Sequence, residues 1–167
     1  MAVELNNVDT LAAPPGYSHV AVGRGGTVVF TAGAVPLDAE GDLVGEGDPV
    51  AQAVQVIENL LAALQTAGAQ PQDVAKTTVY VAGASFEAQS AVWQVVRSSE
   101  IGRAPSTLVG VPILGYRGQL VEVEDRVRIP SRAHALATTS PRPTGSAFSR
   151  KPCIRMSESN SPDLAIN

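Results

Sequence analysis

The sequence predicts an α+β fold in which two helices pack on one face of a mixed β-sheet. Segments that alternate like strands and segments with the three- and four-residue spacing of helices follow one another in the order β-β-α-β-α-β-β. Each helical segment carries a single apolar stripe, so each has one face to bury against a sheet. With 44% hydrophobic but only 4% aromatic residues, we expect a core of Val, Ala, Leu and Ile.

Two strands are expected after an N-terminal arm. Residues 1–13 show no clear period, and we expect a flexible arm there. From Tyr17 the pattern alternates through Val20 and Val22, and it resumes at residues 28–30. The glycine-rich stretch at 23–26 separates the two runs, and glycine supplies the positive φ that a tight turn requires. These residues therefore predict a hairpin.

The two helices have clear boundary signals. Asp48 is a suitable N-cap, Pro49 suits the first helical position, and Gly68 is expected to end the first helix. A second helix is expected at residues 86–97, with Val92, Trp93 and Val96 facing inward. Further strands are expected at residues 76–81, 106–111 and 119–129.

The last predicted strand has two chemically different faces. Alternation places one set of side chains toward the helices: Val121, Val123, Val127 and Ile129. It places charged residues on the opposite face: Glu122, Glu124, Arg126 and Arg128. A face of alternating acids and bases can meet solvent, or it can be covered by another chain.

Composition and charge limit the classes of function. Residues 1–130 hold fourteen acidic against seven basic residues, which argues against a nucleic-acid-binding surface. We find no long apolar run and no signal-peptide pattern, so we expect no membrane partner and a cytoplasmic protein. The single cysteine, Cys153, has no partner at metal-ligand spacing, so no metal is expected. Residues 131–167 are rich in Ser, Thr, Pro and Arg, and we expect a disordered tail that includes His134.

Several segments in the same order resemble the Rid family (RidA/YjgF, the reactive-intermediate deaminases). Residues 15–18 (PGYS) resemble the family's G-P-Y-S, and residues 30–37 (FTAGAVPL) resemble F-T-S-G-Q-I-P-L. Residues 74–81 (VAKTTVYV) resemble V-V-K-T-T-V-F-V. Residues 103–108 (RAPSTL) resemble P-A-R-S-T-V, and residues 120–124 (LVEVE) resemble the I-E-I-E-A strand. The resemblance covers residues 14–130, which we take as one Rid-like domain.

The resemblance implies a fold, an assembly and a pocket. Rid proteins form homotrimers whose sheets close around an inner barrel, with pockets between neighbouring subunits. Glu122 matches the glutamate that handles the attacking water, which makes it the candidate catalytic residue. Pro105 stands where the family has the arginine that pairs with the substrate carboxylate. A bidentate arginine contact is charge-assisted, so its loss is expected to weaken binding of a small imino acid.

The other candidate substrate-binding residues follow from the same motifs. Tyr17 matches the family tyrosine, and Gly33 keeps its place and can offer a backbone N–H. Ala32 replaces the common serine, and Ser90 replaces the common asparagine. Arg103 is a candidate substitute for the missing guanidinium, since it lies two residues upstream on the same face of an extended chain. Arg117 is a weaker candidate, and His19 is expected to be an ordinary polar residue.

Three functions remain open from the sequence. The first is a cofactor-independent enzyme that hydrolyses enamines or imines to a carbonyl compound and ammonia, with a substrate shifted by the loss of the arginine. The second is a non-catalytic trimer that binds a metabolite or a partner in its clefts, as the changes at Pro105, Ala32 and Ser90 suggest. The third is an endoribonuclease, which would need a basic path along the surface.

Overall fold

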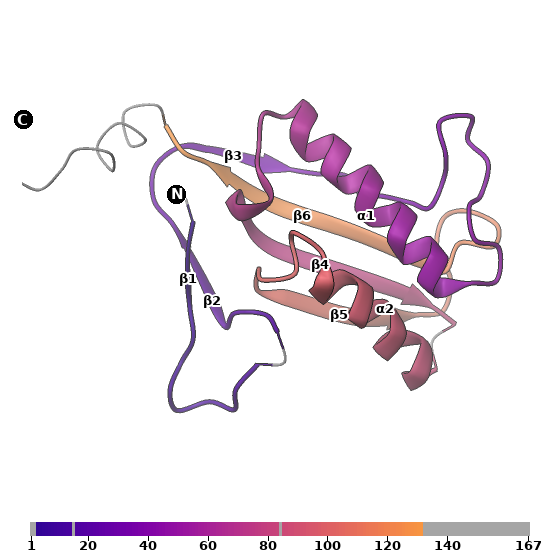
Figure 1. Cartoon of the computed structure of the whole chain (residues 1–167), viewed down its shortest axis with the longest axis horizontal. Coiled ribbons are helices and arrows are strands. Elements are labelled where there is room, and N and C mark those ends of the chain that lie inside the picture. The colour runs from indigo at the N-terminus through magenta and orange to yellow at the C-terminus, as the bar shows by residue number, and fades with distance from the viewer. Residues whose placement is uncertain (1–2, 15, 84, 132–167) are drawn as a thin grey trace, which may run out of the picture.

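The computed structural model describes residues 3–14, 16–83 and 85–131. A four-stranded sheet has the order β3-β6-β4-β5 (Figure 1). These strands are β3 (Thr27–Phe30), β4 (Val74–Ala82), β5 (Ser106–Val111) and β6 (Val121–Ile129). β4 and β5 are parallel, whereas β6 runs antiparallel to both β3 and β4. The predictions for His134, Cys153 and the tail from residue 132 onward lie outside the described residues.

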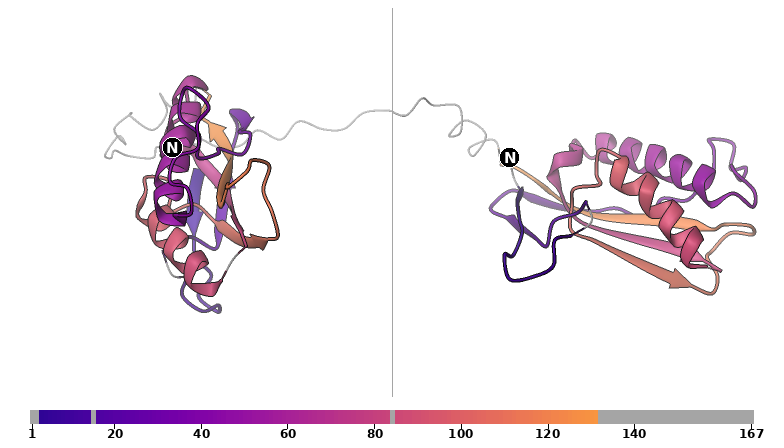
Figure 2. Two further views of the ribbon diagram at one scale, coloured as in Figure 1. Left: turned by 90° about the vertical axis from the view of Figure 1, so that its right-hand side faces the viewer. Right: turned by 60° about the horizontal axis from the view of Figure 1, so that its bottom comes forward.

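Two helices cover one face of this sheet. Figure 2 shows α1 (Pro49–Thr66) and α2 (Phe86–Ser98) on the same side of it. Asp48 caps α1, because its Oδ1 accepts from the backbone N–H groups of Val50 and Ala51 at 2.9 and 3.1 Å. Gly68 follows the end of this helix with φ +72°. The predicted α+β architecture, the N-cap and the position of the helix end are confirmed.

The core lies between the helices and the sheet. Fully buried side chains of α1, Val56, Leu60 and Leu64, belong to the same apolar cluster as Val79 and Val81 of β4. From β6 the cluster takes residues at alternate positions: Val121, Val123 and Val127. The predicted division of β6 into an apolar and a charged face is therefore confirmed. Asp125 lies on the apolar face as well, with only 2% of its surface exposed.

The N-terminal region differs from the prediction. Residues 3–6, expected within a flexible arm, form β1 (Val3–Asn6), which pairs antiparallel with β2 (Val20–Gly23). The expected hairpin between the strands at 20–23 and 27–30 was wrong, because β3 pairs with β6 instead. A strand of nine residues with a buried face offers β3 a longer and better-packed partner than β2 does.

The glycines at 23–26 serve a different purpose from the one expected. An ideal Cβ at Gly26 would lie 1.9 Å from the carbonyl oxygen of Ile129, so a side chain there would collide with β6. Arg128 donates a hydrogen bond from Nε to the Gly25 carbonyl. The glycines therefore allow the backbone to approach the end of β6 closely, and they do not form a turn between paired strands.

Candidate functional site

Glu122 lies on the charged face of the sheet, near the start of β6. In the strand register it is opposite Tyr80 of β4, and its side chain is half-buried. Its Oε2 accepts a hydrogen bond from Gln119 Nε2 at 3.0 Å. Glu122 is therefore held by a neutral amide, and Arg128, a base on the same face of β6, donates to the Gly25 carbonyl.

Gln119 positions this carboxylate, although the sequence analysis did not identify it. It is 4% exposed, and its Oε1 accepts from the backbone N–H of Tyr116 at 3.0 Å. Its Nε2 also donates to the Val121 carbonyl at 3.2 Å. The amide is thus fixed at both ends, and Glu122 Oε2 is fixed through it. A polar residue two positions before a strand gives no sequence signal of this role.

Gly33 lies directly against Glu122. An ideal Cβ at Gly33 would lie 1.9 Å from Glu122 Oε1 and 2.6 Å from its Cδ. The neighbouring residue Ala34 pairs with Val123, through N–H to carbonyl contacts of 2.8 and 3.2 Å. Backbone pairing therefore fixes the segment that contains Gly33, and the missing side chain leaves the space that the carboxylate occupies.

Helix α1 anchors both segments that form this site. Gln52 is fully buried; its Nε2 donates to the carbonyls of Gly45 and Gly118 at 3.1 and 2.9 Å, and its Oε1 accepts from Leu120 N at 2.7 Å. Asn59 donates from Nδ2 to the carbonyls of Val35 and Leu37, both at 2.8 Å. One helix thus holds the segment that follows Gly33 and the segment that precedes Glu122.

Along the strands, the side chains of the charged face change from acidic near Glu122 to basic near Lys76. Near Glu122, Tyr80 donates a hydrogen bond to Glu124 Oε1 at 3.2 Å. Partial burial and then this hydrogen bond raise the pKa of Tyr80. Farther along, Lys76 donates to Thr107 Oγ1, and burial together with the nearby charge of Arg126 lowers the pKa of Lys76. The acidic end of this face is therefore the end that contains Gly33.

Tyr17 lies on the helix side of the sheet, where it lines a hollow. Its ring packs edge-on against Trp93 of α2, with ring centroids 5.9 Å apart and an interplanar angle of 74°. Tyr17, Trp93, Ser106 and Leu108 line a hollow of about 230 Å³. Ser90 lies on α2 one turn before Trp93 and is exposed. We call the lining of this hollow, formed by Tyr17, Trp93, Ser106 and Leu108, the Tyr17–Trp93 wall.

His19 has a structural role, as expected. Its Nδ1 accepts a hydrogen bond from Val8 N at 3.1 Å, and its own backbone N–H donates to Asn7 Oδ1 at 3.1 Å. These contacts tie residues 7–8 to the segment that leads into β2.

Pro105 and Arg103 lie away from Glu122 within one chain. The register places Ser106 level with Thr77 and Asp125, three residues along β6 from Glu122, or about 10 Å. The Pro105 carbonyl accepts from Thr77 N at 3.0 Å, so the strand pairing continues through this proline. Pro105 and Arg103 therefore contact Glu122 only if another copy of the chain brings the two ends together.

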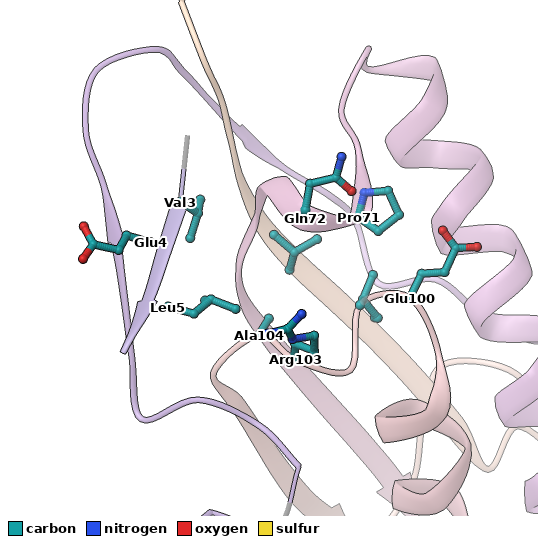
Figure 3. A pocket seen from close by; sticks show the side chains of 10 residues that line it. Val3, Glu4, Leu5, Pro71, Gln72, Glu100, Arg103 and Ala104 are labelled. Atoms are coloured by element: carbon teal, nitrogen blue, oxygen red, sulfur yellow. The ribbon is translucent and has the colours of Figure 1, made fainter. Parts of the chain in front are cut away.

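Arg103 lines a different pocket, of about 540 Å³, between β1 and the body of the domain (Figure 3). Val3 and Leu5 form one side of it, and Val74, Ile101 and Ala104 contribute apolar surface from the domain. Glu4 points away from this space (Figure 3). Arg117 is an exposed residue of the loop before β6.

Residues 3–14, 16–83 and 85–131 contain neither a metal-binding cluster nor a membrane-spanning helix. No group of three or more His, Cys, Asp or Glu side chains in this part of the chain could hold a metal ion. None of its helices is both long enough and apolar enough to cross a membrane.

Comparison with known proteins places the chain in a family. Residues 8–129 match the family model described as Endoribonuclease L-PSP. A RutC family protein of Pyrococcus abyssi is 38% identical over 81 residues, which are 48% of this chain and 63% of that protein. The 2-iminobutanoate/2-iminopropanoate deaminase of Salmonella typhimurium is 43% identical over 56 residues, which are 34% of this chain and 43% of that enzyme. The matched stretches thus span less than two thirds of these curated relatives.

A solved structure agrees over a longer stretch. The protein YyfB of Yersinia pestis, a protein of unknown function from the conserved Rid family, is 32% identical and superimposes with a TM-score of 0.71. The match covers 77% of this chain and all of the Yersinia chain. The family model and this structure agree with the fold described above, and the chain belongs to the Rid/YjgF family, whose model carries the description Endoribonuclease L-PSP.

Proposed function

We propose that the protein is an imine deaminase that hydrolyses reactive imines or enamines to a carbonyl compound and ammonia. The observation that carries this proposal is the placement of Glu122: Gln119 holds one carboxylate oxygen, and the other lies against the backbone of Gly33. A fixed, half-buried carboxylate beside the backbone of a glycine is suited to orient a water molecule. The Salmonella relative named as a 2-iminobutanoate/2-iminopropanoate deaminase supports the same activity.

The proposed reaction needs water as its only co-reactant. Glu122 accepts a proton from water as the water oxygen bonds to the imine carbon, and it passes this proton to the imine nitrogen, which gives a carbinolamine. The carboxylate then carries the hydroxyl proton of the carbinolamine to the same nitrogen as the C–N bond breaks, and the carbonyl product and ammonia leave. Proton transfer by a positioned group typically contributes about 10²- to 10⁴-fold to a rate. Holding water and imine together contributes the remainder.

A homotrimer with pockets between subunits is part of the proposal. Glu122 lies on the open face of the sheet, whereas the Tyr17–Trp93 wall lies on the helix side. A pocket that uses both must therefore draw them from different copies of the chain. Exposed apolar side chains on the open face, Val28 and Phe30, support such an assembly.

The direct test follows imine loss in the presence of the protein. An amino-acid oxidase generates 2-iminopropanoate or 2-iminobutanoate in situ, and the decay of the imine is compared with and without the protein. We expect acceleration by the wild type and a loss of about 10²-fold or more in kcat for Glu122→Gln. Glu124→Gln is the matched control and should stay within about threefold. No acceleration with any carboxylated or neutral imine would overturn the proposal.

The alternative is a non-catalytic trimer that binds a metabolite in the same clefts. The observation that favours it is Pro105, whose position lacks the family arginine and whose carbonyl is engaged in strand pairing. Under this alternative, the wild type would bind a carbonyl product such as 2-oxobutanoate and would not accelerate imine loss. A measured turnover that disappears in Glu122→Gln would reject it.

A further inference from the structure

A line of side chains runs along the exposed surface of α2 beside Tyr17. Ser90, Trp93 and Arg97 are spaced by three and four residues, so they share one side of the helix. The ring of Tyr17 packs edge-on against the ring of Trp93, with the ring centroids 5.9 Å apart. Arg97, in the last turn, is exposed to solvent. Any ligand against the Tyr17–Trp93 wall would have this guanidinium within reach along the same surface.

The Arg97 side chain lies against Gly16, the residue directly before Tyr17. An ideal Cβ at Gly16 would lie 3.2 Å from Arg97 Nε, 3.5 Å from its Cζ and 3.7 Å from its Nη2. Gly16 has φ +99°, a conformation that favours glycine. The guanidinium therefore lies over the backbone directly before Tyr17, in a space that a side chain at position 16 would restrict.

This cation lies close to two residues of the hollow, because Gly16 directly precedes Tyr17 and Trp93 lies one turn before Arg97 on α2. Ser106, the residue that follows Pro105, lines the hollow together with Tyr17, Trp93 and Leu108. Arg103, the substitute expected from the sequence, instead lines the pocket against β1. Guanidinium groups keep their charge at all ordinary pH values and bind carboxylates through two parallel hydrogen bonds. Arg97 thus offers, on the helix side of the sheet and next to Tyr17, the chemistry that position 105 lacks.

We propose that Arg97 is a specificity-determining residue that binds the carboxylate of a small 2-imino acid, with the apolar side chain of the ligand against the Tyr17–Trp93 wall. The identity of the ligand as an imino acid rests on the proposed deaminase function, whereas binding of a small carboxylate does not. The competing interpretation is that Arg97 only complements the dipole at the carboxyl end of α2, since a basic residue in a last turn is favourable there. That role would not depend on the charge of a ligand.

The binding test uses Trp93, the only tryptophan in the chain, as an intrinsic reporter. Its fluorescence is followed during titration with 2-oxobutanoate and, separately, with the uncharged methyl ester of that acid. Arg97→Met is expected to weaken binding of the acid by about 10- to 100-fold and to leave the ester unchanged. Arg97→Lys should restore part of the affinity, and Arg103→Met is the matched control that should bind like the wild type. Equal affinity of wild type and Arg97→Met for the acid would overturn the proposal, as would a larger loss in Arg103→Met.

The kinetic test separates this proposal from the proposed function. With 2-iminobutanoate as substrate, Arg97→Met should raise KM by about tenfold and change kcat by less than about threefold. A purely structural role would lower the melting temperature without this split between KM and kcat. If the wild type binds 2-oxobutanoate through Arg97 and shows no turnover, the deaminase function fails while the carboxylate site stands. If turnover occurs and KM is unchanged in Arg97→Met, the carboxylate site fails and the deaminase function stands.

Discussion

Gly33 shows how one missing side chain shapes the candidate site. A methyl group at this position would lie 1.9 Å from Glu122 Oε1 and 2.7 Å from Cγ, so the whole acidic side chain would have to move. We expect Gly33→Ala to lower kcat for imine hydrolysis by about tenfold or more, because the carboxylate leaves its position beside Gln119. Ala32→Ser, at the exposed neighbouring residue, is the control that should retain activity. Steady-state assays of both variants would decide, and full activity in Gly33→Ala would contradict the expected role.

Asp125 is a buried acid with no part in the proposed chemistry. Its Oδ1 accepts from Thr77 Oγ1 at 2.7 Å, whereas Oδ2 is buried without a hydrogen-bond partner in the described structure. Burial, opposed by the Thr77 hydrogen bond and assisted by the charge of Glu124, raises the pKa of this carboxyl to about 7. The folded protein therefore holds a proton at Asp125 at pH values where the unfolded chain has released it.

The sign of the resulting pH dependence follows from this proton. Between the ordinary aspartate pKa of 3.8 and about 7, the unfolded state binds fewer protons, so stability should fall as the pH rises and then level off. The loss is on the order of 2 to 4 kcal/mol. Asp125→Asn mimics the protonated acid and should flatten this part of the curve, whereas the exposed control Asp9→Asn should not. Urea unfolding at pH 4 to 8 measures the difference, and parallel curves for wild type and Asp125→Asn would contradict it.

Helix α1 links the core to the two segments of the site through a few buried amides. Gln52 satisfies three backbone groups, those of Gly45, Gly118 and Leu120, and no water can replace it readily at 0% exposure. We expect Gln52→Ala to destabilise the fold by about 3 kcal/mol or more, since each unsatisfied buried group costs about 1 to 3 kcal/mol. Gln55→Ala removes a contact with Asn59 only, and it should cost less than about 1 kcal/mol. Chemical denaturation of the two variants tests the contrast.

The elements that the sequence predicts well are those whose signals are local. The N-cap at Asp48, the apolar stripe of α1 and the two faces of β6 each follow from spacing within a few residues. Pairing partners depend on contacts distant in sequence, and so β3 was assigned to β2 although its partner is β6. Asp125 and Gln119 escaped notice for the same reason, because the groups that surround them come from other segments.

The residues of the candidate site also differ in how well the sequence predicts their positions. Glu122 and Gly33 were each candidates because of a family resemblance, and the structure places one against the other. Arg103 was expected near them because two residues along a strand share a face, but the chain at that point turns toward the pocket beside β1. No pattern in the sequence marked Arg97, since its relation to Tyr17 arises only when α2 packs beside residue 16.

At the scale of the whole molecule, the two faces of the sheet differ in how completely they are covered. The helix side is packed, with Val79, Val81, Val121 and Val123 fully buried. On the open side, Val28 and Phe30 of β3 are 44% and 69% exposed, beside the charged residues of β6. An apolar edge next to alternating charges suits contact with another copy of the same sheet, where acids of one copy can meet bases of the next.

Phe30 provides the test of this assembly. We expect the wild type to elute with a mass three times that of the 17.2 kDa chain in size-exclusion chromatography with light scattering. Phe30→Glu should give a folded monomer, because it replaces an exposed apolar ring that the interface would bury with a charged side chain that is costly to desolvate. Phe86→Glu changes an even more exposed phenylalanine, 80% accessible and on the helix side, and should leave the trimer intact. Since Glu122 and the Tyr17–Trp93 wall lie on opposite faces of one chain, the monomer should also lose imine hydrolysis while keeping its circular dichroism spectrum. A monomeric wild type, or a Phe30→Glu variant that remains trimeric and active, would mean that the open face is not the interface.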